Sequence, residues 1–207
     1  RVEPGQVAGR VEGAVTSILK GERTALNFLQ RLSGIATTTA RFVEAVAGLP
    51  VRIIDTRKTT PGLRLLEKYA VRVGGGHNHR SHLGDGILIK DNHLAALRRL
   101  GLGVGEAVAR ARRAAPHTLR VQVEVQTYEQ AVQALDARAE ALLLDNMLPS
   151  EMRRVVEMAR GRALLEASGG ITLANIRAVA ETGVDLISLG ALTHSAGSLD
   201  ISLEVEV

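Results

Sequence analysis

The chain has 207 residues with a formal net charge of +4, and 45% of them are hydrophobic, which is enough to bury the core of one α/β domain. It has two Tyr, two Phe and no Trp, so it lacks the aromatic platforms on which nucleic acid stacks, and small anionic ligands explain the positive charge better. No apolar run reaches the roughly 18 to 20 residues of a membrane span, so we expect no membrane partner. The absence of cysteine excludes disulfides and thiolate metal sites and fits a cytoplasmic protein.

The first part of the chain contains two different patterns. Residues 2–18 alternate small apolar residues with Gly5, Gly9 and Gly13, which predicts short strands and turns from the end of a β-rich domain. Residues 22–46 space their apolar side chains at helical intervals instead. We expect one long helix there, or two helices broken near Ser33 and Gly34.

After Pro50, six short apolar runs alternate with helical stretches, which predicts a parallel sheet. The last four runs begin 22 residues apart, at positions 119, 141, 163 and 185. A capping box at Thr127 to Gln130 and Pro149 at a helix start mark the intervening helices. The six runs are 51–55, 87–90, 119–125, 141–145, 163–168 and 185–190.

Each run ends in a residue suited to ligand binding, and this favours one of two possible architectures. A closed or nearly closed barrel would bring the six run ends together, whereas an open doubly wound sheet would spread them along an edge. We therefore predict an α/β fold with an irregular or incomplete parallel β/α barrel. The six residues are Asp55, Lys90, Glu124, Asp145, Ser168 and Gly190.

Four cations in three predicted loops indicate an anionic ligand. Arg57, Lys58, Arg80 and Lys90 suit a substrate with several carboxylates or phosphates, because arginine binds carboxylates through two hydrogen bonds and lysine acts as a point charge. The alternative is that these cations form structural ion pairs with nearby acids, namely Asp55, Asp85 and Asp91.

Two acids at the ends of neighbouring runs are candidates for a magnesium site. Glu124 and Asp145 could hold the ion directly or through water against a pyrophosphate. The alternative is that they are partners of the cations, with no metal bound.

Two glycine turns and several histidines complete the candidate site. Glycines in Ser168–Gly170 and in Leu189–Ala191 would expose backbone N–H groups to a phosphate. The alternative is that these glycines form ordinary tight turns that bind no ligand. His77, His79 and His82 resemble a zinc cluster, but nothing else in the chain completes one. We expect His79 to donate a hydrogen bond to a carboxylate beside Arg80, and His194 to reach a phosphate.

Together these motifs resemble the quinolinate phosphoribosyltransferase family of NAD biosynthesis, and the resemblance covers nearly the whole chain. It implies a phosphoribosyl transfer from phosphoribosyl pyrophosphate to quinolinate, with loss of carbon dioxide, to give nicotinate mononucleotide and pyrophosphate. The motifs that carry it are residues 22–27, 32–37, 55–59, 61–62, 74–80, 90–93, 124–125, 145–146, 168–171 and 188–191.

The resemblance also assigns roles to residues. It implies that Arg57, His79, Arg80 and Lys90 hold the two carboxylates of quinolinate, while Arg23 reaches the site of a neighbouring subunit in a homodimer or larger homo-oligomer. Lys58, Lys90, Glu124 and Asp145 would be catalytic, with magnesium as the cofactor. The full set expected to contact substrate is Arg23, Thr56, Arg57, Lys58, His79, Arg80, Lys90, Glu124, Asp145, Ser168, Gly169, Gly170, Leu189, Gly190, Ala191 and His194.

Family members have a longer N-terminal α/β sandwich domain, so the resemblance implies a division of this chain. Residues 1–20 would be the end of that domain, residues 21–195 the catalytic barrel, and residues 196–207 a strand that returns to the N-terminal domain. Two other functions remain open: a paralogue that transfers phosphoribosyl to another acidic heterocycle or acts beside a metal-uptake system, and a non-catalytic sensor of phosphate ligands.

Overall fold

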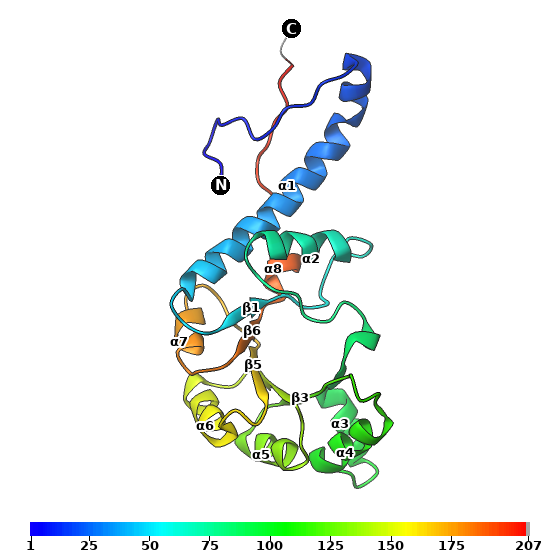
Figure 1. Cartoon of the computed structure of the whole chain (residues 1–207), viewed down its shortest axis with the longest axis vertical. Coiled ribbons are helices and arrows are strands. Elements are labelled where there is room, and N and C mark those ends of the chain that lie inside the picture. The colour runs from blue at the N-terminus through cyan, green and yellow to red at the C-terminus, as the bar shows by residue number, and fades with distance from the viewer. Residues whose placement is uncertain (206–207) are drawn as a thin grey trace.

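A computed structural model describes residues 1–205 of the chain, and Figure 1 shows their arrangement. The strands are β1 (Arg52–Ile54), β2 (Ile87–Ile89), β3 (Val121–Val125), β4 (Ala141–Asp145), β5 (Leu164–Ser168) and β6 (Leu186–Ser188). The helices are α1 (Val15–Ala45), α2 (Arg64–Val73), α3 (Asp91–Arg98), α4 (Val104–Ala114), α5 (Tyr128–Asp136), α6 (Pro149–Ala159), α7 (Ile176–Ala180) and α8 (Ala191–His194), with a 3-10 turn, η1, at Leu83–Asp85.

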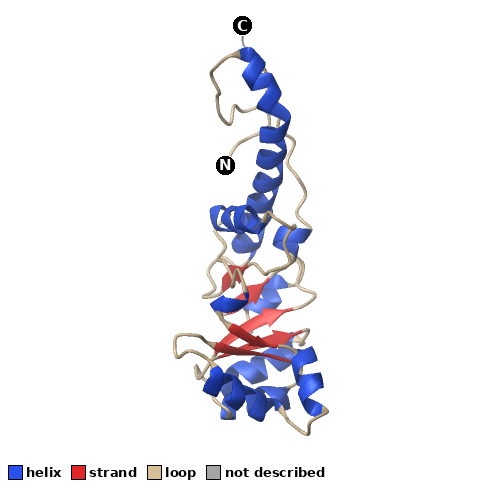
Figure 2. Cartoon of the chain, turned by 90° about the vertical axis from the view of Figure 1, so that its right-hand side faces the viewer, coloured by secondary structure: helices blue, strands red, loops and turns tan. Residues whose placement is uncertain are grey.

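The six strands form one parallel sheet in the order β1-β6-β5-β4-β3-β2. Strands β1 and β2 are its two edges and do not pair with each other, so the barrel is incomplete, as predicted. Helices α4 to α7 follow the outer side of the strands, and α1, α2 and α8 cover the end where β1 and β6 lie (Figures 1 and 2). All six predicted strands are confirmed.

The two faces of the sheet differ in chemistry. The register aligns Glu124 with Leu143, Leu143 with Glu166, and Glu166 with Leu186, so these residues share one face. Gln122, Asp145, Ser168 and Ser188 lie on the same face, because each is two residues away from one of these residues in its own strand. The opposite face carries buried apolar residues that form the core, including Val123, Val125, Leu142, Leu144, Leu165 and Ile187.

Helix starts agree with the sequence signals. The Thr127 side chain accepts a hydrogen bond from the backbone N–H of Gln130 (3.3 Å), which satisfies one free donor at the start of α5. Pro149 occupies the first turn of α6, where its missing N–H costs no hydrogen bond. Both signals therefore predicted the starting residues of their helices correctly.

The N-terminal prediction was wrong in its first part. No strand forms in residues 1–14, and α1 begins at Val15. Strands need a partner for their backbone groups, and Val2, Val7 and Val11 are 58%, 65% and 62% exposed, so within the described chain this segment has no sheet to join. Helix α1 then continues unbroken to Ala45, so of the two predicted alternatives the single long helix is confirmed.

Gly34 lies inside α1 because another segment crosses there. A Cβ at this position would overlap the carbonyl oxygen of Gly197 in the C-terminal segment. Glycine thus lets the C-terminal segment approach α1 closely. The helix does not end at Gly34, since α1 has tertiary contacts on both sides of this residue. The buried side chains of α1 flank this point at Leu26, Ile35 and Phe42.

The C-terminal strand predicted over residues 196–207 is not present in residues 196–205, and residues 206–207 lie outside the described part. The segment runs along α1 instead: Leu199 N–H donates to the Gln30 carbonyl (3.1 Å), and Gln30 Nε2 donates to the Ile201 carbonyl (2.9 Å). A helix offers an adjacent segment only isolated hydrogen-bond partners of this kind, so a β-type ladder of backbone hydrogen bonds cannot form. Within residues 1–205, no helix combines the length and the apolar character that crossing a membrane requires.

Candidate active site

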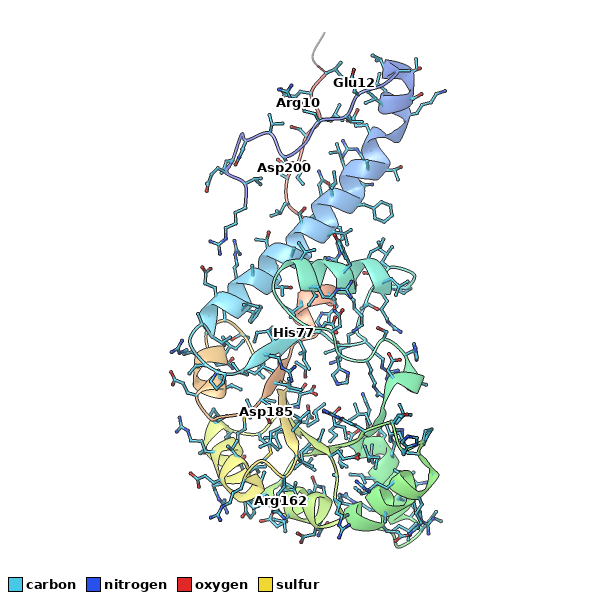
Figure 3. The ribbon with its side chains drawn as sticks, viewed as in Figure 1. Arg10, Glu12, His77, Arg162, Asp185 and Asp200 are labelled. Atoms are coloured by element: carbon cyan, nitrogen blue, oxygen red, sulfur yellow. The ribbon has the colours of Figure 1, made fainter. Side chains whose placement is uncertain are left out.

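The loop after β1 is fixed by a buried carboxylate. Asp55 is fully buried, and its Oδ1 accepts hydrogen bonds from Lys68 Nζ and from the backbone N–H of His79 (2.8 Å). Its Oδ2 accepts from Asn78 Nδ2 (2.6 Å). His77, which lies beside β1 in Figure 3, extends the pairing by exchanging backbone hydrogen bonds with Ile53 and Asp55. Asp55 therefore has a structural role: it holds the loop that begins at His77.

Within the described part of the chain, the four predicted ligand-binding cations form no ion pairs with protein acids. Among residues 1–205, none of the salt bridges includes Arg57, Lys58, Arg80 or Lys90. Asp85, one of the proposed partners, binds His82 instead (2.8 Å). The described structure therefore does not support the alternative of structural ion pairs for these four side chains.

Arg57 and Arg80 come close enough to affect each other. Burial, and then the positive charge of Arg57, lower the pKa of Arg80 below its ordinary value, whereas the charges of Glu166 and Asp85 oppose this. The Arg80 guanidinium is oriented by a hydrogen bond from Nη1 to the Gly86 carbonyl (2.8 Å). Two cations held this close favour an anion between them.

Glu166 was missed by the sequence analysis. It is 2% exposed, and its Oε2 accepts a hydrogen bond from Gln122 Nε2 (2.7 Å) and faces His79 Nε2 at 3.4 Å. Burial tends to raise its pKa, but hydrogen bonds from His79, Ser188 and Gln122 lower the pKa below its ordinary value. The available signal was the alternation with a period of two that places Gln122 and Glu124 on one face of β3, and Glu166 and Ser168 on the same face of β5.

The magnesium candidates lie near each other. The pKa of Glu124 is raised, first by burial and then by the negative charges of Asp145 and Asp91, and Lys90 partly offsets this. Among residues 1–205 there is no group of three or more acidic or histidine side chains arranged around a metal position. Two carboxylates fit a magnesium ion that keeps several waters and also binds substrate phosphates, rather than one caged by protein. The zinc alternative at His77, His79 and His82 finds no support in the same residues.

The turn after β5 requires its glycines. Gly169 and Gly170 have φ values of +90° and +61°, and a Cβ on Gly169 would overlap the side-chain amide of Asn146. Asn146 itself is left-handed (φ +54°), and its N–H donates to the Ser168 carbonyl (2.9 Å). The turns after β4 and β5 are thus packed together, with Asp145 and Ser168 paired in register.

Lys58 and His194 converge on the turn after β6. A Cβ on Gly190 would lie 2.9 Å from His194 Nε2 and 3.1 Å from Lys58 Cδ, so only glycine leaves this space open. Thr193 Oγ1 donates to the Lys58 carbonyl (2.7 Å), which ties the two loops together. The structure therefore brings Lys58, Gly190 and His194 together, as the sequence analysis expected.

Three further predicted residues have limited side-chain roles. Leu189 is 3% exposed and packs in the core, so only its backbone faces the site. Ala191, the first residue of α8, offers a backbone N–H and a methyl group. The Thr56 hydroxyl accepts the N–H of Lys58 (3.0 Å) and shapes the loop that carries this lysine.

Comparisons with known proteins agree with this geometry. The family model described as the quinolinate phosphoribosyl transferase C-terminal domain matches residues 35–204, and the model of the N-terminal domain matches residues 1–33. The chain belongs to the quinolinate phosphoribosyl transferase family. The two models meet within α1; our own division at residues 20 and 195 remains a prediction.

Relatives of this family span several kingdoms. A probable nicotinate-nucleotide pyrophosphorylase (carboxylating) of Bacillus subtilis is 49% identical over 97% of this chain and 68% of its own length. The human nicotinate-nucleotide pyrophosphorylase (carboxylating) is 45% identical over 94% of this chain and 66% of its own length. The crystal structure of NadC from Streptococcus pyogenes has a TM-score of 0.88 at 47% identity, covering 93% of this chain and 66% of that one. The chain thus spans about two thirds of the length of these relatives.

Arg23 lies apart from the other predicted site residues of this quinolinate phosphoribosyl transferase family member. It is exposed on α1, and the N-terminal half of that helix extends away from the sheet (Figure 1). The structure therefore does not bring Arg23 to the site of its own chain. Its expected contact with a neighbouring subunit stays a prediction.

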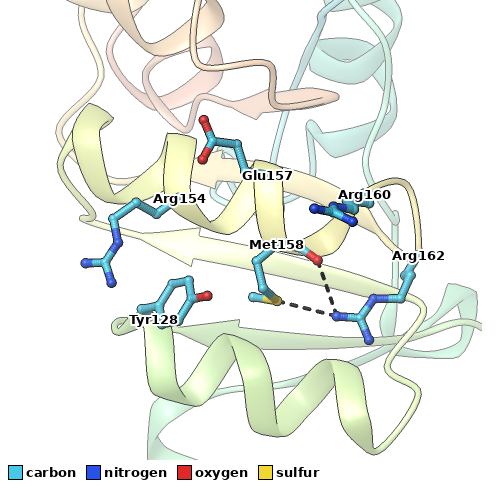
Figure 4. Close-up of a pocket in the computed structure, with 6 residues that line it drawn as sticks. All are labelled: Tyr128, Arg154, Glu157, Met158, Arg160 and Arg162. Carbon is cyan, nitrogen blue, oxygen red and sulfur yellow. Dashed lines mark hydrogen bonds between the residues drawn. The ribbon is translucent and has the colours of Figure 1, made fainter.

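A spacious groove lies elsewhere on the molecule. It has a volume of about 610 Å³ and lies between α5 and α6, where Arg154 stacks on Tyr128 at 4.6 Å from the ring centre (Figure 4). Apart from Tyr128 at the start of α5, its residues belong to α6 and to the turn before β5, away from the C-terminal strand ends where barrels place their active sites. We therefore assign the candidate site to the strand ends. The groove is lined by Tyr128, Arg154, Glu157, Met158, Arg160 and Arg162.

Proposed function

We propose that this chain is the catalytic part of an enzyme that transfers phosphoribosyl from phosphoribosyl pyrophosphate to quinolinate and releases carbon dioxide, as a step of NAD biosynthesis in the cytoplasm. One observation carries the proposal: four cations in the segments next to β1 and β2 have no ion-pair partner in the described chain, and two carboxylates that repel each other lie near the C-terminal ends of β3 and β4. Such a site suits one substrate rich in carboxylates and another rich in phosphates.

The quinolinate half of the proposed site contains Arg57, Arg80 and Lys90. Arg57 lies in the loop after β1, Arg80 in the loop between α2 and β2, and Lys90 directly after β2, and together they clamp the two carboxylates of the substrate. The clamp places the pyridine nitrogen toward the ribose, which replaces a random encounter by a fixed orientation. Nicotinate has one carboxylate and would leave part of this clamp without a partner, so it should be a poor substrate.

The phosphoribosyl half contains Lys58, His194 and the turns at Gly169, Gly170 and Gly190. Glu124 and Asp145 would hold magnesium, which neutralises part of the pyrophosphate charge when it is bound. Lys58 stabilises the electron pair that leaves with pyrophosphate when the C1–O bond of the ribose breaks and the pyridine nitrogen bonds to C1.

Loss of carbon dioxide follows from the charge on the ring. Once the pyridine nitrogen carries the ribose it is cationic, and its charge can stabilise the electron pair that stays on the neighbouring ring carbon when the carboxylate leaves as carbon dioxide. A proton then takes the place of that carboxylate on the ring carbon. The second carboxylate stays bound by the cationic clamp, so the product keeps its orientation until release.

We also propose a homodimer in which Arg23 of one subunit completes the site of the other. Two observations support it: Arg23 is exposed, and α1 carries it away from its own barrel (Figure 1). Large apolar side chains surround it on the same half of the helix, with Leu19, Phe28 and Leu29 exposed by 54%, 42% and 54%. Exposed apolar surface of this kind is typical of a subunit interface.

The test is turnover of quinolinate with phosphoribosyl pyrophosphate and magnesium, with nicotinate mononucleotide and carbon dioxide followed together. We expect both products in equal amounts, a loss of at least about 100-fold in kcat/KM for Lys90→Ala, and at least about 100-fold discrimination against nicotinate. Arg113→Ala, an exposed change on the outer helix α4, is the control and should retain activity.

Equal use of nicotinate and quinolinate would overturn this assignment and favour the paralogue. Because the chain spans about two thirds of its relatives, the assay is run both on the 207 residues and on a chimera carrying the N-terminal domain of the Bacillus subtilis relative. A folded chimera that binds phosphoribosyl pyrophosphate but forms no product would favour the sensor.

A further inference from the structure

The first turn of α2 contains a buried carboxylate that the reaction described above does not use. Glu67 is fully buried, and its Oε1 accepts hydrogen bonds from Arg31 Nη2 (2.9 Å) and from Thr60 Oγ1 (2.8 Å). Its Oε2 accepts the backbone N–H of Thr60 (3.1 Å). A buried carboxylate is costly unless it is paired and hydrogen-bonded, and Glu67 is both. These contacts connect α2 to α1 through Arg31 and to the loop after β1 through Thr60.

The guanidinium of Arg31 also reaches a third element. Its Nη1 donates to the Ala196 carbonyl (2.7 Å), and its Nη2 donates to the Thr193 carbonyl. These oxygens lie in and just after α8, where a helix end leaves carbonyl groups without partners of its own. A planar guanidinium can bind a carboxylate and two carbonyls at once, because its N–H groups point in fixed directions. The Arg31–Glu67 pair therefore joins α1, α2 and α8, which lie together at the β1 end of the sheet (Figure 1).

Lys58 and His194 lie on the segments that this ion pair joins. Thr60 follows Lys58 by two residues, and Thr193 directly precedes His194. Thr193 Oγ1 also donates to the Lys58 carbonyl (2.7 Å), so the two segments are tied to each other. A Cβ on Gly190 would fill the space between Lys58 Cδ and His194 Nε2. Movement of either segment would therefore change the distance between these two side chains.

The quinolinate half is held by a different residue of the same helix turn. Arg64, the first residue of α2, donates from Nη2 to the Arg57 carbonyl (3.2 Å) and from Nη1 to the Ser81 carbonyl (2.9 Å). Ser81 directly follows Arg80, so this one guanidinium fixes the backbone beside both arginines of the proposed clamp. Loss of the ion pair between α1 and α2 should therefore disturb the phosphoribosyl half and leave the quinolinate half in place.

We propose that Arg31 and Glu67 are positioning residues for the phosphoribosyl half of the site. Their ion pair fixes the two segments that carry Lys58 and His194, and these two side chains then face the phosphates of the substrate. Glu67 is fully buried and Arg31 directs its guanidinium at protein acceptors, so both act through other residues. The inference rests on the proposed function for the identity of the ligand, whereas the placement of the two segments is a property of the free protein.

A role in stability alone predicts a different outcome. An ion pair that only holds the fold together can be replaced by apolar side chains of similar size, often without loss of stability. The double variant Arg31→Met, Glu67→Leu makes this replacement but offers no hydrogen bond to Thr60 or to the carbonyls of α8. It therefore restores packing without restoring the placement of Lys58 and His194.

The first test compares the double variant and Arg31→Lys with the wild type in the turnover assay of the proposed function. In both, kcat/KM for phosphoribosyl pyrophosphate should fall about 10- to 100-fold while the KM for quinolinate changes by less than about 2-fold, because one half of the site is misplaced. A Tm within about 3 °C of the wild type shows that the double variant is folded. If it does not fold, Arg31→Lys, which keeps the positive charge, decides.

Two kinetic results would overturn the positioning role. One is wild-type kinetics in the folded double variant, or in Arg31→Lys, and the other is an equal loss for both substrates. Arg177→Lys is the matched control, because Arg177 also binds one carboxylate, on Glu181 (3.0 Å), and one backbone carbonyl of another segment, on Ala47 (3.1 Å). This contact joins α7 to the segment before β1, so Arg177→Lys should retain both constants.

The second test needs no turnover and uses NMR of protein labelled with 15N in its six histidines. The His194 ring signals, assigned by their loss in His194→Gln, should shift in Arg31→Lys, whereas those of His117, exposed between α4 and β3, should stay the same. Unchanged His194 signals in Arg31→Lys would overturn the link between the ion pair and this side chain. A wild-type protein that forms no product would count against the proposed function and leave the NMR result to decide the link.

Discussion

The two halves of the candidate site differ in whether their charged groups attract or repel each other. On the β1 side, Asp55 has hydrogen-bond donors on both oxygens, and these bonds fix Lys68, Asn78 and the His79 backbone. On the β3–β4 side, burial and then the negative charges of Asp145 and Asp91 raise the pKa of Glu124. The first half is therefore held in place by attraction within the protein, whereas the second contains repulsion.

The backbone shows the same contrast. The turns after β4 and β5 contain left-handed residues, with Asn146 at φ +54° and Gly169 at φ +90°, and they contact each other closely. For a residue other than glycine, such as Asn146, this conformation costs energy and persists where the surroundings enforce it. The difference teaches that the proposed quinolinate half is organised in the free protein, whereas the repulsion in the proposed phosphate half would be relieved if a cation bound there.

The largest expected effect comes from removing the charge that organises the first half. Asp55→Asn keeps the size of the side chain but leaves the buried Lys68 ammonium without a counter-charge, which should cost about 3–5 kcal/mol of unfolding free energy. Urea denaturation gives this value. Asp136→Asn, an exposed acid 3.9 Å from Arg162, is the matched control and should leave the midpoint unchanged. A loss below about 1 kcal/mol for Asp55→Asn would show that this half is not organised by its ion pair.

A smaller effect is expected from the turn in the second half. Gly169→Ala must accept both a left-handed backbone and an overlap with the Asn146 amide, and we expect a loss of about 2–3 kcal/mol. Gly161→Ala has a similar φ of +75° but open space around it, so it should lose about 1 kcal/mol. Thermal unfolding of the two variants isolates the cost of the overlap. Equal losses would mean that the Asn146 side chain moves away freely.

The sequence predicted the strands better than the termini, for a physical reason. Strands buried on both faces of a parallel sheet give continuous apolar runs, so β3, β4 and β5 could be read directly. Residues 2–14 and 200–205 show strand-like composition, but a strand forms only with a partner, and the described chain supplies none. Composition indicates what a segment can form, and the partner decides whether it does.

The site was predictable where it depends on position along a strand. Lys58, Glu124, Asp145 and Gly190 follow from the rule that parallel strands end at one edge, and the structure gathers them there. Glu166 lies inside an apolar run and not at its end, so this rule does not find it; only its alternation with Ser168 marks the polar face in the sequence, and its contacts with Gln122 and His79 appear in the structure alone. The roles assigned to these residues remain predictions that the proposed assays test.

The smallest expected effect is the change in stability caused by Glu124→Gln, and the direction of this change tests the difference between the two halves. The folded pKa of Glu124 is raised above the ordinary value of 4.5, so the folded state keeps a proton that the unfolded state has released as pH rises past that value. The unfolding free energy therefore falls as pH rises through the window between the two pKa values. Glu124→Gln removes this loss, so at neutral pH its Tm should rise by about 1–3 °C.

The measurement is Tm against pH, from about pH 4 to about pH 7, with no magnesium added. The curve of Glu124→Gln should be flatter than that of the wild type and lie above it at the neutral end. Glu129→Gln provides a control of opposite sign, because backbone and Thr127 hydrogen bonds lower the pKa of Glu129, and this stabilisation is present at neutral pH and lost as pH falls. If Glu124→Gln were less stable at neutral pH, Glu124 would be held by attraction, and the two halves of the site would not differ in the way proposed.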